Sequence, residues 1–86
     1  MQVTVRRRRW EFTRGPVAKG TDGYCDPPNA FGKRIVVRKS LTGERELEVT
    51  IHELLHAAHW DLCEEAIEET AADLARALHK MGYRVQ

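Results

Sequence analysis

Residues 44–60 read ERELEVTIHELLHAAHW, and they carry the clearest structural pattern in the chain. Its apolar side chains recur one or two helical turns apart, which is typical of an amphipathic helix. Thr42 is a suitable N-cap, and Glu44 and Glu46 place negative charge where a helix N-terminus favours it. We therefore predict a helix over residues 44–60. Its apolar stripe consists of Leu47, Ile51, Leu54, Leu55 and Ala58.

A second helix is expected over residues 62–81. Asp61 is a candidate N-cap for it, with Glu64 three residues on in the capping-box position, and Gly82 is a natural terminator. The connection between the two helices is short, so we predict an antiparallel helical hairpin. The apolar stripe of this second helix consists of Ile67, Ala71, Leu74, Leu78 and Met81.

The chain before the helices reads as extended structure and loop. In residues 2–13, Val3 and Val5 share one face of a strand, whereas Trp10 and Phe12 share the other, which predicts a bulge or two short strands. Most of the glycines and all three prolines fall in residues 15–33, which predicts a loop. A further strand is expected at 34–39. The predicted class is α+β, with a small N-terminal β layer packed on the helical hairpin.

Length and composition favour one small domain spanning residues 1–86, with a basic β and loop half at 1–43. A chain of 86 residues has a thin core, and such domains often depend on a metal or a partner chain, so self-association is reasonable. With 42% hydrophobic and 31% charged residues, the composition is that of a globular protein. No apolar run approaches the ~18–20 residues of a membrane span, and no apolar segment follows the N-terminal basic residues. We expect a cytoplasmic protein whose two cysteines are reduced.

The first helix carries His52-Glu53-Leu54-Leu55-His56, an HExxH motif. Histidines at i and i+4 lie on one face, one turn apart, and can bind one zinc ion together. Glu53 lies about 100° around the helix, so it is placed to accept a proton from metal-bound water rather than to bind the metal. The motif therefore predicts a Zn2+ site with His52 and His56 as ligands and Glu53 as the catalytic base.

A third protein ligand is expected from the second helix, which offers Glu64, Glu65, Glu68 and Glu69. If the hairpin turns near Asp61, the level midway between the two histidines lies opposite Glu68. Glu68 also shares a helix face with Ala72 and Ala75, whose small side chains allow close approach. We take Glu68 as the expected ligand. Because a shift of the turn by one residue moves the opposing level by two, Glu65 and Glu69 stay open as alternatives.

These motifs resemble the zincin metallopeptidases, and in particular the glutamate-ligand branch called gluzincins. The run Glu68-x-x-Ala71-x-x-Leu74-Ala75-x-x-Leu78 is similar to the glutamate helix of the ImmA/IrrE-type peptidases, and the size is similar to that of minimal gluzincins and small phage zincin-like proteins. The resemblance covers residues 44–81. It implies a β-sheet whose edge strand lines the cleft and a zinc metalloendopeptidase acting on a peptide or protein substrate. Glu69-x-x-x-Asp73 also fits the gluzincin ExxxD pattern, which makes Glu69 the alternative ligand.

Four other residues carry weaker signals. His59 lies ~10 Å along a straight helix from His52, too far to share its metal, so a structural role is expected. Tyr83 could stabilise an oxyanion, and Cys25 could occupy the open zinc position, although a plain loop cysteine is the simpler reading. Cys63 is expected to be a small buried hydrophobe.

A run of four arginines, Arg6 to Arg9, precedes Trp10 and supports a competing function. Residues 1–43 carry ten Lys and Arg against three acids, whereas residues 44–86 carry four against ten. Arginines beside an aromatic ring can bind nucleic acid, but in a strand at most two of the four share a surface. The alternatives to a peptidase are therefore a nucleic-acid-binding module and a catalytically silent zincin fold that serves in an assembly.

Overall fold

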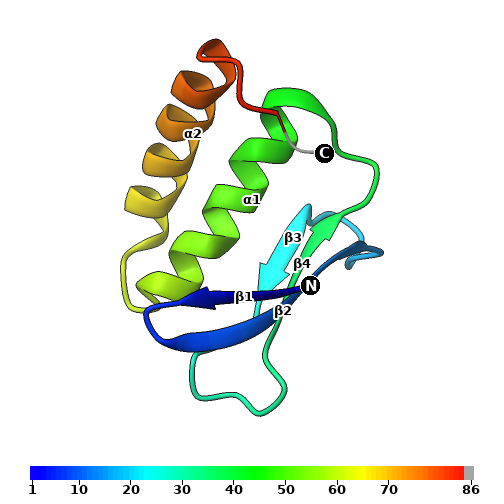
Figure 1. Cartoon of the computed structure of the whole chain (residues 1–86), viewed down its shortest axis with the longest axis vertical. Helices are drawn as coiled ribbons and strands as arrows, with labels where there is room; N and C mark the ends of the chain where they lie inside the picture. The colour runs from blue at the N-terminus through cyan, green and yellow to red at the C-terminus, as the bar shows by residue number, and fades with distance from the viewer. Residues whose placement is uncertain (85–86) are drawn as a thin grey trace.

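The computed structural model describes residues 1–84 and has an α+β architecture, in which a four-stranded sheet packs against helices (Figure 1). The helix α1 lies against the sheet, and α2 packs on α1 and contacts no strand of the described chain. The predicted α+β class is confirmed. The elements in chain order are β1 (Gln2–Val5), β2 (Arg8–Gly15), β3 (Gly23–Cys25), β4 (Arg34–Arg38), α1 (Gly43–Ala58) and α2 (Glu64–Lys80).

The sheet is mixed, with strand order β1-β2-β4-β3. The strands β1 and β2 form an antiparallel hairpin whose turn is Arg6 and Arg7, with φ of 48° and 71°. Residues 2–13 therefore form two strands, which is one of the two predicted options. β4 pairs parallel to β2, and β3 pairs antiparallel to β4, which leaves β3 at one edge of the described sheet.

The strand β3 corrects one prediction, because residues 15–33 were expected to be loop throughout. Gly23, Tyr24 and Cys25 pair with Val37, Val36 and Ile35. A strand of three residues is too short to show an alternating pattern. Pairing with a buried neighbour, not local preference, creates this strand.

The core lies between the sheet and α1. Trp10, Ile35 and Ala57 form a buried cluster, and the Trp10 indole N–H donates a hydrogen bond of 3.1 Å to the Asp26 carbonyl. Val3 is the cross-strand partner of Trp10, so the hairpin turn brings the apolar residues of β1 and β2 to one face. The partly buried residues around the cluster are Val3, Val5, Phe12, Cys25 and Leu54.

The burial of α1 differs from the predicted stripe. Thr42 is the N-cap as predicted, but its side chain makes no capping hydrogen bond. The predicted stripe is only half-buried, and the most buried face lies about 140° around the helix from it. A helix between a sheet and a second helix buries more than one face, which an apolar stripe alone does not reveal. The buried residues of α1 are Glu46, Val49, Glu53 and Ala57.

The start of α2 also differs from the prediction. Its N-cap is Cys63, not Asp61, and Cys63 is exposed rather than buried. The buried face consists of Ile67 and two small residues, Ala71 and Ala75, while Leu74 remains 44% exposed. Gly82 follows the helix with a φ of 100°, as expected of a terminator. Within residues 1–84, no helix is long and apolar enough to cross a membrane.

Candidate metal centre

Three potential metal ligands converge on one point between α1 and α2. The Nε2 atoms of His52 and His56 are 3.2 Å apart. Glu64 spans both, with Oε1 2.9 Å from His52 Nε2 and Oε2 3.2 Å from His56 Nε2. Each residue offers one ligand atom, and the three lie within 4.8 Å of one another. We call His52, His56 and Glu64 the triad.

The two histidines owe their arrangement to the helix itself. At i and i+4 they lie one turn apart on α1, and their ring centroids are 4.9 Å apart. The end of this helix is held by Arg6 in the β1–β2 turn, whose Nη1 donates a hydrogen bond of 2.9 Å to the Ala58 carbonyl. The helix turn that carries His56 is thereby tied to the sheet.

Glu64, not Glu68, is the glutamate that the structure brings to the histidines. Glu64 is the first residue of α2 and is 57% exposed. Glu68 lies one turn later and lines the same cavity as His52 and Glu64, but it is not part of the triad. Glu69 lines a further cavity together with His52 and Glu68, and it is not part of the triad.

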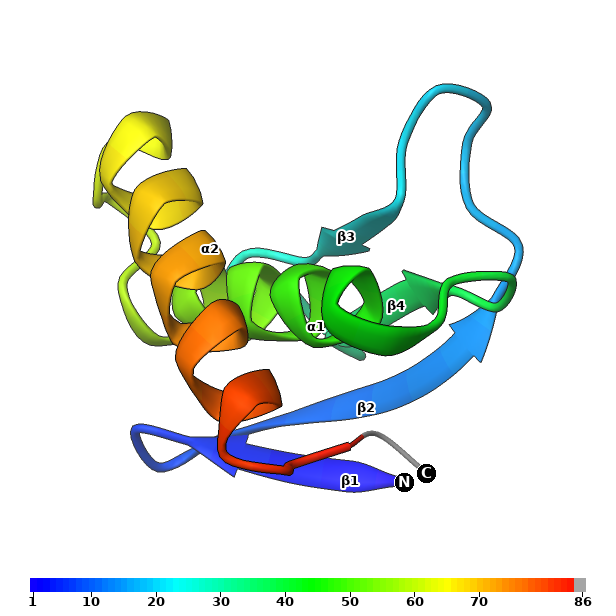
Figure 2. The same ribbon diagram turned by 90° about the horizontal axis from the view of Figure 1, so that it is seen from above.

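The crossing of the two helices explains why Glu64 reaches the histidines, although the sequence predicted Glu68 at their level. Figure 2 shows that α2 crosses α1 obliquely: its first turn lies on the β3 side of α1 and its last turn on the β1 side. The residue of α2 that meets the histidines is therefore set by the crossing of the helices and not by counting residues from the turn. A signal was present in the sequence, since Glu64 precedes Ile67, Ala71 and Ala75 at i+3, i+7 and i+11 and so shares their buried face.

The donor atoms fit a zinc ion. Ligands 2.0–2.1 Å from a tetrahedral zinc are about 3.3 Å from each other, close to the separations within the triad. Two histidines and one glutamate are a known ligand set of catalytic zinc, and they leave the fourth position open. Burial, with a contribution from His52, lowers the pKa of His56 and so favours the neutral imidazole that a metal requires, although the Glu64 carboxylate acts in the opposite direction.

Glu53 lies beside the triad, with its carboxylate against Gly23 of β3. It is 6% exposed and lines the same cavities as His52 and Glu64. Burial, with a contribution from the Glu64 charge, raises the pKa of Glu53 to about 7. A carboxylate with this pKa can accept a proton near neutral pH, which is the property of a general base.

The triad opens into a cleft along the edge strand β3. Two cavities of about 270 and 330 Å3 meet there, because both are lined by Gly23, His52, Glu53 and Glu64. Cys25 lines the first cavity, and burial raises the pKa of its thiol to about 12, with Glu53 and Asp26 contributing. The thiol is therefore protonated, and its Sγ lies 3.4 Å from the Asp26 carbonyl.

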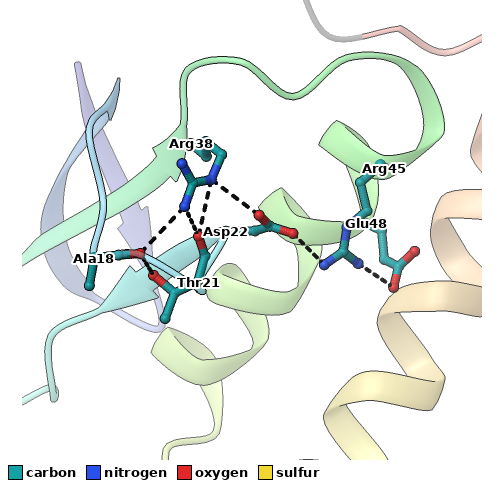
Figure 3. Close-up of polar contacts among 6 residues, drawn as sticks. All are labelled: Ala18, Thr21, Asp22, Arg38, Arg45 and Glu48. Atoms are coloured by element: carbon teal, nitrogen blue, oxygen red, sulfur yellow. Dashed lines mark hydrogen bonds and ion pairs between the residues drawn. The ribbon is translucent and has the colours of Figure 1, made fainter.

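A polar network holds the mouth of the cleft together (Figure 3). Asp22, just before β3, accepts hydrogen bonds from Arg45 of α1 at 2.7 Å and from Arg38 of β4 at 3.2 Å. Arg45 also donates to Glu48 at 3.0 Å. These bonds lower the pKa of Asp22, Arg45 most strongly. One carboxylate thus connects the segment before β3 to α1 and to β4.

The remaining predicted candidates lie outside the triad. His59 is in the connection after α1, where its backbone N–H donates a hydrogen bond to the Leu55 carbonyl, and its side chain is not part of the triad. Tyr83 is 58% exposed and lies beyond the end of α2. Asp73 pairs with Arg76 on the exposed side of α2, so the ExxxD pattern is not assembled around the histidines.

Comparison of the chain with protein-family models, with curated proteins and with solved structures gave no significant match. The function must therefore be inferred from the site itself.

Proposed function

We propose that the chain is a zinc-dependent peptide hydrolase of minimal zincin type, with His52, His56 and Glu64 as metal ligands and Glu53 as general base. The observation that carries the proposal is the triad, whose donor atoms lie within 4.8 Å of one another beside a buried carboxylate. A zinc ion held there would supply Lewis acidity, which polarises a carbonyl group and acidifies water.

The chain's own residues would divide the remaining work. The edge of β3 offers backbone groups to which an extended peptide can pair, and such pairing holds the peptide along the cleft. The carboxylate of Glu53 would accept a proton from water in the cleft and return it to the amine that leaves. Its burial between β3 and α1 keeps the carboxylate in one place for both transfers.

The nucleic-acid alternative is less well supported by the positions of the arginines. Arg6 is engaged by the end of α1, and Arg9 donates to the Gln2 side chain at 3.5 Å. Arg8 lines a cavity beside the connection between the helices. The four consecutive arginines therefore do not form one surface that could follow a phosphate backbone.

Metal analysis and turnover test the proposal together. The protein purified without chelator should contain about one zinc per chain, and His52→Ala should contain none. Glu53→Gln should keep the zinc while hydrolysis of a peptide library falls about 10²- to 10⁴-fold, the usual worth of a positioned acid–base group. Loss of zinc in Glu53→Gln would contradict its assigned role. Zinc binding without turnover in the wild type would instead identify a catalytically silent member of this fold.

A further inference from the structure

A further cavity, of about 350 Å3, lies beside the cleft. Trp60 lines both, and its ring centroid is 5.9 Å from that of His56. Its walls come from three segments: the β1–β2 hairpin with Arg6 and Arg8, the β3–β4 loop with Pro28, and the connection between the helices. We call this space the arginine cavity.

Arg8 is the cationic side chain of this cavity that has no partner among residues 1–84. It stands two residues before the buried Trp10 in β2, so both side chains lie on the sheet face that α1 covers. Arg6 is bound to the Ala58 carbonyl and neutralises the negative end of α1. Within residues 1–84, the Arg8 guanidinium makes neither a hydrogen bond nor an ion pair.

The other groups of the cavity define what it can bind. Asp61 and His59 also line it, and Asp61 reduces the net positive charge without pairing with Arg8 in the described chain. Trp60 and Leu62 are both 43% exposed, so they present apolar surface next to the charge. A short apolar stem that ends in a carboxylate matches this combination.

We propose that the arginine cavity binds a carboxylate of the peptide substrate, two or three residues from the scissile bond, and that Arg8 is the specificity-determining residue. The inference rests on the proposed peptide hydrolase function. The spacing follows from the geometry, because an extended peptide advances about 3.3 Å per residue and Trp60 separates the cavity from His56 by roughly one aromatic ring. The carboxylate can belong to a Glu or Asp side chain or to the peptide's C-terminus.

Peptide binding to the full chain, with and without zinc, tests the inference. The probes are alanine-rich hexapeptides: one series is blocked at both ends and carries Glu or Gln at each position in turn, and a second carries Gln with a free or amidated C-terminus. Binding is followed by the fluorescence of Trp60, since Trp10 is only 1% exposed and contributes a constant background. Arg8→Gln is compared with Arg9→Gln, which removes the same charge from the neighbouring position, where Arg9 contacts Gln2.

The wild type and Arg9→Gln should bind the carboxylate-bearing peptide about fivefold more tightly than its neutral partner, the upper range for an exposed ion pair. Arg8→Gln should abolish that ratio, and the series that shows the effect identifies the source of the carboxylate. An equal ratio in Arg8→Gln and Arg9→Gln, or no preference in the wild type, would overturn the inference. Because the comparison is also made without zinc, it is independent of the outcome for metal binding and turnover, whose failure would overturn the proposed function instead.

Discussion

Gly23 on β3 and Glu53 on α1 lie so close together that a Cβ atom on the glycine would stand 3.1 Å from Glu53 Oε2. The same Cβ would stand 2.9 Å from the Val36 carbonyl and 3.0 Å from Val49 Cγ1. The missing side chain therefore allows the edge strand to approach the helix that carries the histidines. The position of the buried carboxylate depends on this approach.

Gly23→Ala should consequently destabilise the fold by about 1–3 kcal/mol, the usual cost of overpacking. The backbone oxygen of Val36 cannot move away as a flexible side chain would, so either β3 or α1 must shift. Urea denaturation measures the change. Gly15→Ala is the matched control, because a Cβ on Gly15 would meet no atom within 4 Å; equal losses in the two variants would contradict the proposed close packing.

Glu64→Gln should lower zinc affinity more than about 100-fold, beyond the 10- to 100-fold loss seen for groups that only support a ligand. Glu68→Gln is the matched control on the same helix and should change the affinity little. Competition with a chromophoric chelator measures both. If Glu68→Gln shows the larger loss, Glu68 is the ligand, as the sequence predicted. In that case α2 crosses α1 differently in the zinc-bound protein.

Zinc should stabilise the folded chain. A ligand present at 100 times its dissociation constant adds about 2.7 kcal/mol to the free energy of unfolding, which for a domain of this size raises Tm by about 10–20 °C. Differential scanning calorimetry before and after addition of a chelator measures the shift. His52→Ala should show the same Tm under both conditions, and a zinc-dependent shift that persists in this variant would place the metal elsewhere.

Arg14 connects the end of β2 to α1 through an ion pair with Glu46, which is buried. It also donates to the Leu41 carbonyl at 3.3 Å. Arg14→Met leaves the Glu46 charge without its partner and should cost about 1–3 kcal/mol, less than for a fully enclosed pair because Arg14 is 32% exposed.

Chemical denaturation of Arg14→Met measures this cost, with Arg9→Met in the same strand as the control. Adding Glu46→Leu to Arg14→Met should recover most of the loss, since the buried charge is then gone as well. A double variant no more stable than Arg14→Met would show that the ion pair is not the cause.

Asp22 should make the stability of the fold depend on acid pH. Hydrogen bonds from Arg45 and Arg38 hold its pKa below the ordinary value of 3.8, so the folded state favours the charged form. The stabilisation is therefore fully present above pH 3.8 and is lost as the pH falls through the lower pKa of the folded state. The difference in unfolding free energy between the wild type and Asp22→Asn should be constant at pH 5–7 and shrink below pH 3.8.

Urea denaturation at each pH measures that difference. Asp61→Asn serves as the control, because Asp61 is exposed in the connection between the helices and forms no ion pair in the described chain. A difference for Asp22→Asn that grows as the pH falls would contradict the sign of the pKa shift.

The local parts of the site could be predicted from the sequence. His52 and His56 share a face because both stand on one helix, and the helical repeat fixes that relation whatever packs around it. The same holds for the α+β class, since the apolar spacing of residues 44–58 and the alternation near Trp10 reflect the elements that form there.

The parts that required contact between distant segments could not be predicted. Three residues at β3 become a strand only because β4 pairs with them. Glu64 and Glu68 are the same residue type and stand one turn apart, and the oblique crossing of α2 over α1 decides which of them reaches the histidines (Figure 2). The sequence alone determines that the two histidines share one helix face, because both stand on the same helix. Packing between the helices selects the third member of the triad. Side chains of two helices meet at a point set by the crossing of the helices and not by their distance from the turn.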